Sequence, residues 1–161
     1  MGEACVVNAS PLIFLARGGH LDLLKIFGGT VSVPQTVADE IGRRGAADPA
    51  ARALAETLWL DVVANESVPQ QVVAWTLGPG ESSVLAVALA RRGSRAVIDD
   101  LAGRRCAAAL GVPVAGTLGI VLRARRAGLI PAARPVLEDL VAGGMYLSRD
   151  VLDRGLALVG E

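Results

Sequence analysis

Short apolar runs alternate along this chain with longer segments in which apolar residues recur at helical spacing. The short runs, three of which contain CVV, AVI and VPV without alternation, predict strands at residues 4–8, 30–33, 59–63, 95–98 and 112–115. The longer segments predict helices at residues 11–17, 21–27, 35–44, 49–57, 81–92, 100–110, 117–127, 131–142 and 149–159.

This alternation predicts an α/β fold, because parallel strands need helical crossovers between them. We expect a doubly wound, mainly parallel sheet of about five strands with helices on both faces. The length and the lack of a linker or repeat predict a single domain, residues 1–161, in which residues 145–161 form a C-terminal helical extension.

Polar side chains gather where such a sheet binds its ligands, outside the carboxyl ends of the strands. Asn8 ends the first predicted strand, and Asp99 and Asp100 end the fourth. Glu40 lies in the segment VADEI, and Glu81 opens a predicted helix. Because crowded carboxylates must be neutralised by a proton or a cation, this pattern indicates a divalent metal site and phosphate chemistry.

Charge and histidine content narrow the possible mechanisms. Sixteen acidic and sixteen basic residues cancel, so net charge gives no argument for a nucleic-acid partner. Lys25 is the only lysine, so arginine supplies the phosphate contacts, and Arg104 and Arg105 are the best candidates because they follow Asp100 by one helical turn. A single histidine, His20, excludes serine triads and two-histidine metal mechanisms.

The cysteines and the hydropathy pattern predict a cytoplasmic protein. Cys5 and Cys106 lack metal-ligand spacing and lie in apolar segments, which predicts buried, reduced thiols. The longest uncharged stretch, residues 106–122, is shorter than the roughly 20 residues of a spanning helix and contains Pro113 and several glycines. We therefore expect no membrane segment, and the N-terminal residues have no basic leader.

Each candidate at the helix starts also has a purely structural explanation. Glu81 could favour its helix through the macrodipole, and Asp100 could be an N-cap. Thr117 is a natural N-cap of the helix that follows the last strand. Because Asp99 and Asp100 would point to opposite faces of an extended strand, we expect Asp100 to face the site and Asp99 to support it.

The remaining candidates have local alternatives as well. Glu40 could pair with Arg43 or Arg44, which follow it by three and four residues. Asn8 and Ser10 could satisfy backbone groups in the turn before Pro11.

The order of four segments, VVNASPLIFLA, VPQTVADEI, LGPGESSVLAVALA and AVIDDLAGRRCAAALG, resembles PIN domains over about residues 4–145. The resemblance implies a doubly wound nuclease fold with a carboxylate site for Mg²⁺ or Mn²⁺. It assigns the metal or catalytic positions to Asn8, Glu40, Glu81 and Asp100, with Asp99 as a further metal ligand. Ser10 and Thr117 take supporting positions.

The resemblance implies a metal-dependent ribonuclease that hydrolyses RNA by in-line attack of water on the phosphodiester. Small stand-alone proteins of this kind are commonly toxins of toxin–antitoxin pairs, which implies an antitoxin partner and a homodimer. The family commonly has Asp at the first position, where this chain has Asn8, and a further acidic residue where it has Ala102. The alternative is a catalytically weakened PIN-like module that binds RNA or protein.

Overall fold

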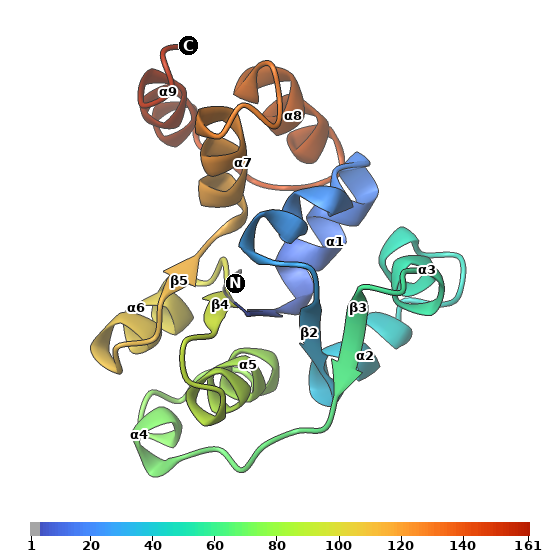
Figure 1. The fold of residues 1–161 in the computed structure, drawn as a ribbon, viewed down its shortest axis with the longest axis vertical. Coiled ribbons are helices and arrows are strands. Elements are labelled where there is room, and N and C mark those ends of the chain that lie inside the picture. The colour runs from blue at the N-terminus through green and yellow to red at the C-terminus, as the bar shows by residue number, and fades with distance from the viewer. Residues whose placement is uncertain (1–3) are drawn as a thin grey trace.

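Five parallel strands form one sheet in the computed structural model, which describes residues 4–161 (Figure 1). The strand order is β3-β2-β1-β4-β5. The strands are β1 (Cys5–Val7), β2 (Val31–Pro34), β3 (Leu60–Val63), β4 (Arg95–Val97) and β5 (Val114–Ala115). The predicted α/β sheet is confirmed, and the last strand is shorter than expected because Pro113 has no N–H to donate to a ladder.

The predicted helices are present, with small shifts at their ends. They are α1 (Ala9–Gly18), η1 (Leu21–Phe27), α2 (Gln35–Gly42), α3 (Pro49–Glu56), α5 (Pro79–Ala90), α6 (Leu101–Ala109), α7 (Thr117–Arg126), α8 (Ala133–Ala142) and α9 (Arg149–Ala157). The segment η1 is a 3₁₀ helix. The helix α5 begins two residues before Glu81, because Pro79 is suited to the first turn, where no N–H is needed. One short helix, α4 (Gln70–Val73), was not predicted.

The central strand β1 is fully buried and pairs in parallel on both sides. Cys5 is opposite Val31 of β2 and opposite Arg95 of β4. This pairing explains the unalternating CVV run, since neither face of the strand meets water.

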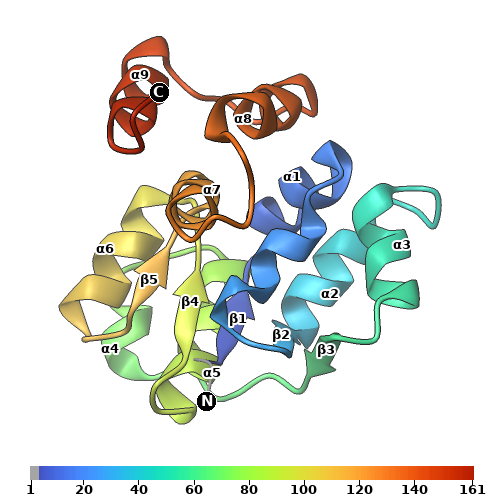
Figure 2. The same ribbon diagram turned by 45° about the horizontal axis from the view of Figure 1, so that its top comes forward.

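Helices cover both faces of the sheet. The helix α5 packs against β1, β2 and β4 on one face. On the other face lie α1 and α7, which contact each other. The helices α8 and α9 lie beyond α7, away from the sheet (Figure 2). Within residues 4–161, no helix combines the length and the apolar character needed to cross a bilayer.

Both cysteines are buried and free, as predicted. Burial raises the pKa of the Cys5 thiol to about 12, although the charge of Arg95 opposes the shift. Burial also raises the pKa of the Cys106 thiol. Neither group is suited to act as a thiolate nucleophile or metal ligand at neutral pH.

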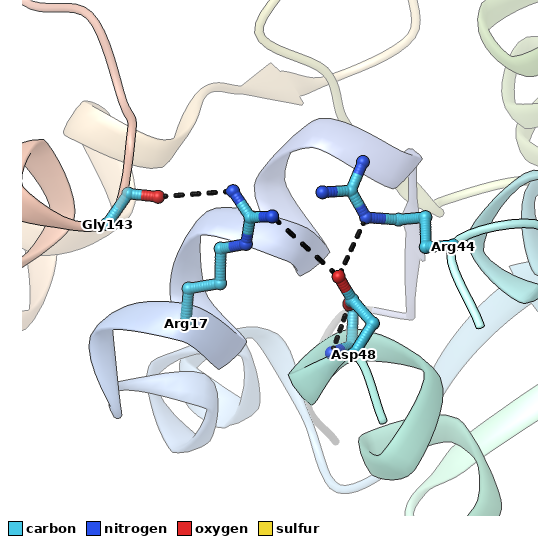
Figure 3. Close-up of polar contacts among 5 residues, drawn as sticks. Arg17, Arg44, Asp48 and Gly143 are labelled. Atoms are coloured by element: carbon cyan, nitrogen blue, oxygen red, sulfur yellow. Dashed lines mark hydrogen bonds and ion pairs between the residues drawn. The ribbon is translucent and has the colours of Figure 1, made fainter. Parts of the chain in front are cut away.

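Asp48 connects three separate parts of the chain (Figure 3). As N-cap of α3 it accepts a hydrogen bond from the Ala50 backbone N–H at 2.9 Å. Its Oδ2 accepts a hydrogen bond from Arg44 Nε at 3.0 Å and lies 3.7 Å from Arg17 Nη2. The other terminal nitrogen of Arg17, Nη1, donates to the Gly143 carbonyl. Partial burial raises the pKa of Asp48, but the hydrogen bonds from Arg44 and Ala50 and the two arginine charges outweigh it, so the pKa is lowered.

Because the folded pKa of Asp48 lies below its usual 3.8, its contribution to stability is complete above that value and is lost as pH falls through the folded pKa. We predict that Asp48→Asn loses less free energy of unfolding than the parent between neutral pH and about pH 2. Urea unfolding at both pH values measures this. Asp153→Asn, on the exposed surface of α9, is the control and should behave like the parent. Equal losses for the parent and Asp48→Asn would contradict the prediction.

Candidate functional site

Asn8 lies at the carboxyl end of β1, beside the end of β4. Its backbone N–H donates to the Val97 carbonyl at 3.0 Å, and its side chain is buried. Although Asn8 is the N-cap residue of α1, its side chain makes no capping bond. Instead Nδ2 donates to Glu81 Oε1 at 2.9 Å. The expectation that Asn8 only satisfies a local turn is therefore wrong for the side chain.

The other polar atom of the Asn8 amide is buried without a partner. Within the described residues, Asn8 Oδ1 accepts no hydrogen bond. A Cβ added to Gly80 would lie 2.8 Å from Asn8 Oδ1 and 3.2 Å from Glu40 Oε2. The missing Cβ therefore lets the amide oxygen and a carboxylate oxygen approach one point, next to the start of α5.

A hollow of about 320 Å³, which we call the acidic hollow, opens at this point. Its lining includes Glu40 and Glu81, together with Thr36, Arg43, Pro79 and Gly80. Thr36, Glu40 and Arg43 are spaced by four and three residues, so they share one face of α2. Arg44 is drawn away to Asp48, so it does not neutralise Glu40 as one alternative supposed.

Asp100 lies close to this hollow and has a capping role. As N-cap of α6, its Oδ2 accepts from the Gly103 backbone N–H at 2.9 Å, which confirms the capping expectation. A Cβ added to Gly103 would lie 3.3 Å from Glu81 Cγ. Asp100 and Glu81 thus both lie next to Gly103.

Asp99 faces a different environment. Its two carboxylate oxygens accept from the backbone N–H and the hydroxyl of Thr117, each at 2.7 Å. The N-cap residue of α7 is Gly116, which has no side chain to form a cap, so Asp99 supplies the cap from another part of the chain. The prediction that Thr117 is itself the N-cap is therefore wrong, because Thr117 already lies inside the helix.

A second hollow, of about 450 Å³, extends from Asp99 and is called here the tyrosine hollow. Arg104 lies at its polar end, and within residues 4–161 this side chain makes no hydrogen bond or ion pair. Phe14 and Leu118 contribute to its apolar walls, and Tyr146 lies on its rim. Arg105 and Ser10 are exposed and line neither hollow.

The predicted residues thus divide into two groups. Asn8, Glu40 and Glu81 come together around Gly80, with Asp100 beside them. Asp99, Thr117 and Arg104 belong to the neighbouring hollow or its margin.

The oxygen atoms at the acidic hollow are of the kind that bind a hard divalent metal. In the part of the chain that the structure describes, no three Asp, Glu, His or Cys side chains form a group that could hold a metal ion. Mg²⁺, however, commonly binds through one or two carboxylates and keeps several waters. The buried, unpartnered Asn8 Oδ1 is an acceptor that a cation would satisfy. Asn8, Glu40 and Glu81 therefore fit a hard divalent ion held from one side.

Sequence reasoning did not assign Thr36, Arg43 or Tyr146 to a site, although all three line these hollows. Thr36 could have been found from its four-residue spacing to Glu40. The sequence alone favours Arg43 as an ion-pair partner of Glu40 or as part of a solvated arginine cluster. Tyr146 gave no usable signal, because its position depends on how the segment between α8 and α9 returns to α7.

A family model described as the PIN domain matches residues 4–161, almost the whole chain. None of the curated proteins compared with the chain matches it. The PIN match indicates a nuclease-like module, of a kind that generally uses divalent metals and binds nucleic acid.

Replacing Asn8 with Asp tests the electrostatics of this site. Asn8→Asp sets a carboxylate oxygen against Glu81 Oε1, where an amide N–H now donates. In EDTA at neutral pH we predict a loss of about 1–3 kcal/mol in the free energy of unfolding. Added Mn²⁺ should raise the melting temperature more than in the parent, because the ion offsets the repulsion.

Thermal unfolding followed by circular dichroism, with EDTA or with MnCl₂, measures both effects. Gln71→Glu adds the same charge on the exposed surface of α4 and should change neither. If Asn8→Asp melts like the parent in EDTA and does not respond to Mn²⁺, the proposed arrangement is wrong.

Proposed function

Since the chain belongs to the PIN domain family, we propose that it is a divalent-metal-dependent endoribonuclease that hydrolyses RNA phosphodiester bonds. One observation carries the proposal most strongly. The buried Asn8 Oδ1 has no partner within the described residues. It approaches the same point beside Gly80 as Glu40 Oε2, and Gly80 and Glu40 both line the acidic hollow. An acceptor in this position is explained by a cation.

In this proposal Asn8, Glu40 and Glu81 hold Mg²⁺ or Mn²⁺, with Asp100 and Asp99 as further acidic groups at the same edge. When bound, such an ion supplies Lewis-acid activation of water and offsets negative charge on the phosphate. The chain itself orients the ligands. The Asn8 side-chain Nδ2 donates to one oxygen of Glu81 and fixes its position, and the lack of side chains at Gly80 and Gly103 leaves room for the carboxylates.

The positive groups beside the carboxylates would bind the RNA backbone. Arg43 lines the acidic hollow and Arg104 the tyrosine hollow, so each hollow has one guanidinium in its lining. Guanidinium groups bind phosphate in a bidentate manner, which would fix the strand across the edge of the sheet. Arg105, on the exposed surface of α6, would add a more peripheral contact.

Cleavage of a labelled, mixed-sequence single-stranded RNA tests this function. We predict cleavage with Mn²⁺ or Mg²⁺, none with EDTA, and a loss of about 100-fold or more in Glu81→Gln, which keeps the bond to Asn8 but loses the charge. Asp100→Asn preserves the α6 cap and should also lower the rate. Glu138→Gln, on the exposed surface of α8, is the matched control. Equal cleavage by the parent and Glu81→Gln would refute the assigned site.

A second candidate function is an RNA- or protein-binding module that does not cleave. Asn8 favours it, because an amide brings no charge and binds a hard cation less well than a carboxylate does. RNA binding without cleavage by the parent, followed by cleavage in Asn8→Asp, would identify a site that is complete except for this charge.

We further propose that the nuclease is the toxin of a toxin–antitoxin pair, acting as a homodimer and neutralised by an antitoxin protein. The support is the family, whose model matches residues 4–161. Induced expression in bacterial cells should then arrest growth, while Glu81→Gln at an equal protein level should not, because its RNA hydrolysis is lost. Colony counts and immunoblots measure this, and equal growth of the two strains would count against a toxin.

A further inference from the structure

We propose that the tyrosine hollow binds one base of single-stranded RNA, next to the phosphate that is cleaved, and that the ring of Tyr146 stacks on this base. The inference rests on the proposed RNA substrate. It adds a subsite for an unpaired nucleotide, in which Tyr146, from the segment between α8 and α9, joins Asp99 and Arg104.

The backbone around Tyr146 holds its ring in the solvent. Met145 is buried, its N–H donates to the Leu140 carbonyl at 3.0 Å, and Leu147 packs against the core. Between these two anchored residues Tyr146 is 86% exposed. An aromatic ring so exposed gains little from the fold, but it can stack on a base, since every base has a flat π-face.

The walls beside Tyr146 suit the apolar faces of a base. Leu118 and Leu122 come from α7, and Phe14 comes from α1. The volume of about 450 Å³ lies in the range of small-molecule sites. Sequence-tolerant binding of single strands commonly combines such apolar contacts with aromatic stacking.

The polar end of the hollow matches the rest of a nucleotide. Asp99 is held by Thr117, and each of its carboxylate oxygens has a further lone pair that can accept from a base amino group. Arg104, which has no hydrogen bond or ion pair within residues 4–161, is available for a phosphate. A carboxylate and a guanidinium beside apolar walls fit a base with its phosphate better than a purely apolar protein segment.

The tyrosine hollow lies at the same edge of the sheet as the acidic hollow, where the strands have their carboxyl ends. Asn8, Asp99 and Gly116 come directly after or near the ends of β1, β4 and β5, which are neighbours in the sheet. An RNA strand with its scissile phosphate at Glu40 and Glu81 would therefore place an adjacent nucleotide against Asp99 and Arg104.

Binding without cleavage tests this subsite independently of catalysis. Fluorescence anisotropy with a labelled, mixed-sequence single-stranded RNA in EDTA gives the affinity of each variant. We expect Tyr146→Ala to weaken binding about tenfold and Tyr146→Phe, which keeps the stacking face, to stay within about twofold. Leu58→Ala, at a fully exposed apolar residue outside both hollows, is the control and should bind like the parent.

A series of RNAs with one abasic nucleotide locates the stacked base. At one position the abasic substitution should weaken binding to the parent but add no further loss in Tyr146→Ala, because both changes remove the same contact. The proposal is overturned if Tyr146→Ala binds RNA like the parent, if Tyr146→Phe loses as much as Tyr146→Ala, or if abasic losses add fully at every position. If Tyr146→Ala binds RNA like the parent, the tyrosine hollow is instead a candidate site for a protein partner.

Two readouts keep this inference separate from the proposed function. Circular dichroism and melting temperature verify that the Tyr146 variants are folded. If the parent binds RNA through Tyr146 but does not cleave it with Mn²⁺, hydrolysis fails and the base subsite stands. If the parent cleaves RNA and Tyr146→Ala binds it equally well, the subsite fails and hydrolysis stands.

Discussion

Parallel pairing of β1 with both β2 and β4 is the constraint on which the rest of the site depends. Cys5 is fixed opposite Val31 and Arg95, so the positions at which these three strands end are fixed relative to one another. A slip of one residue would turn every side chain of β1 to the opposite face and carry Asn8 away from α5. The buried residues of β1, a strand of three residues, thus determine where Asn8 lies at the edge of the sheet.

The second constraint is the close approach of polar side chains to the backbone at the edge where the strands have their carboxyl ends. Gly80 and Gly103 both lie where a side chain would collide with the polar groups or with Glu81. Glu81 can be held in this space because the group facing it is an amide that donates to it. A neutral residue at position 8 therefore allows the protein to keep two carboxylates near a buried oxygen without strong repulsion.

Features that depend on local chemistry could be predicted from the sequence. The strand and helix order followed from periodicity, and the Asp100 cap followed from its position before a helix. Hydrogen bonds between residues far apart in the sequence could not be predicted in this way. Asn8 donates to a residue 73 positions away instead of capping its own helix, and the α7 cap comes from Asp99, 18 positions before Thr117. In both cases a local capping bond, which the sequence suggests, is replaced by a bond to a residue that comes close only after the sheet has formed.

The anchored residues on either side of Tyr146 have a consequence for substitutions at this position. Met145 and Leu147 hold the backbone through core contacts, so the side chain between them can change without a cost to folding. The acidic edge has no such freedom, since its glycines and carboxylates share one crowded space. A substitution at position 146 therefore changes what the tyrosine hollow presents to solvent while the arrangement of the acidic edge stays the same.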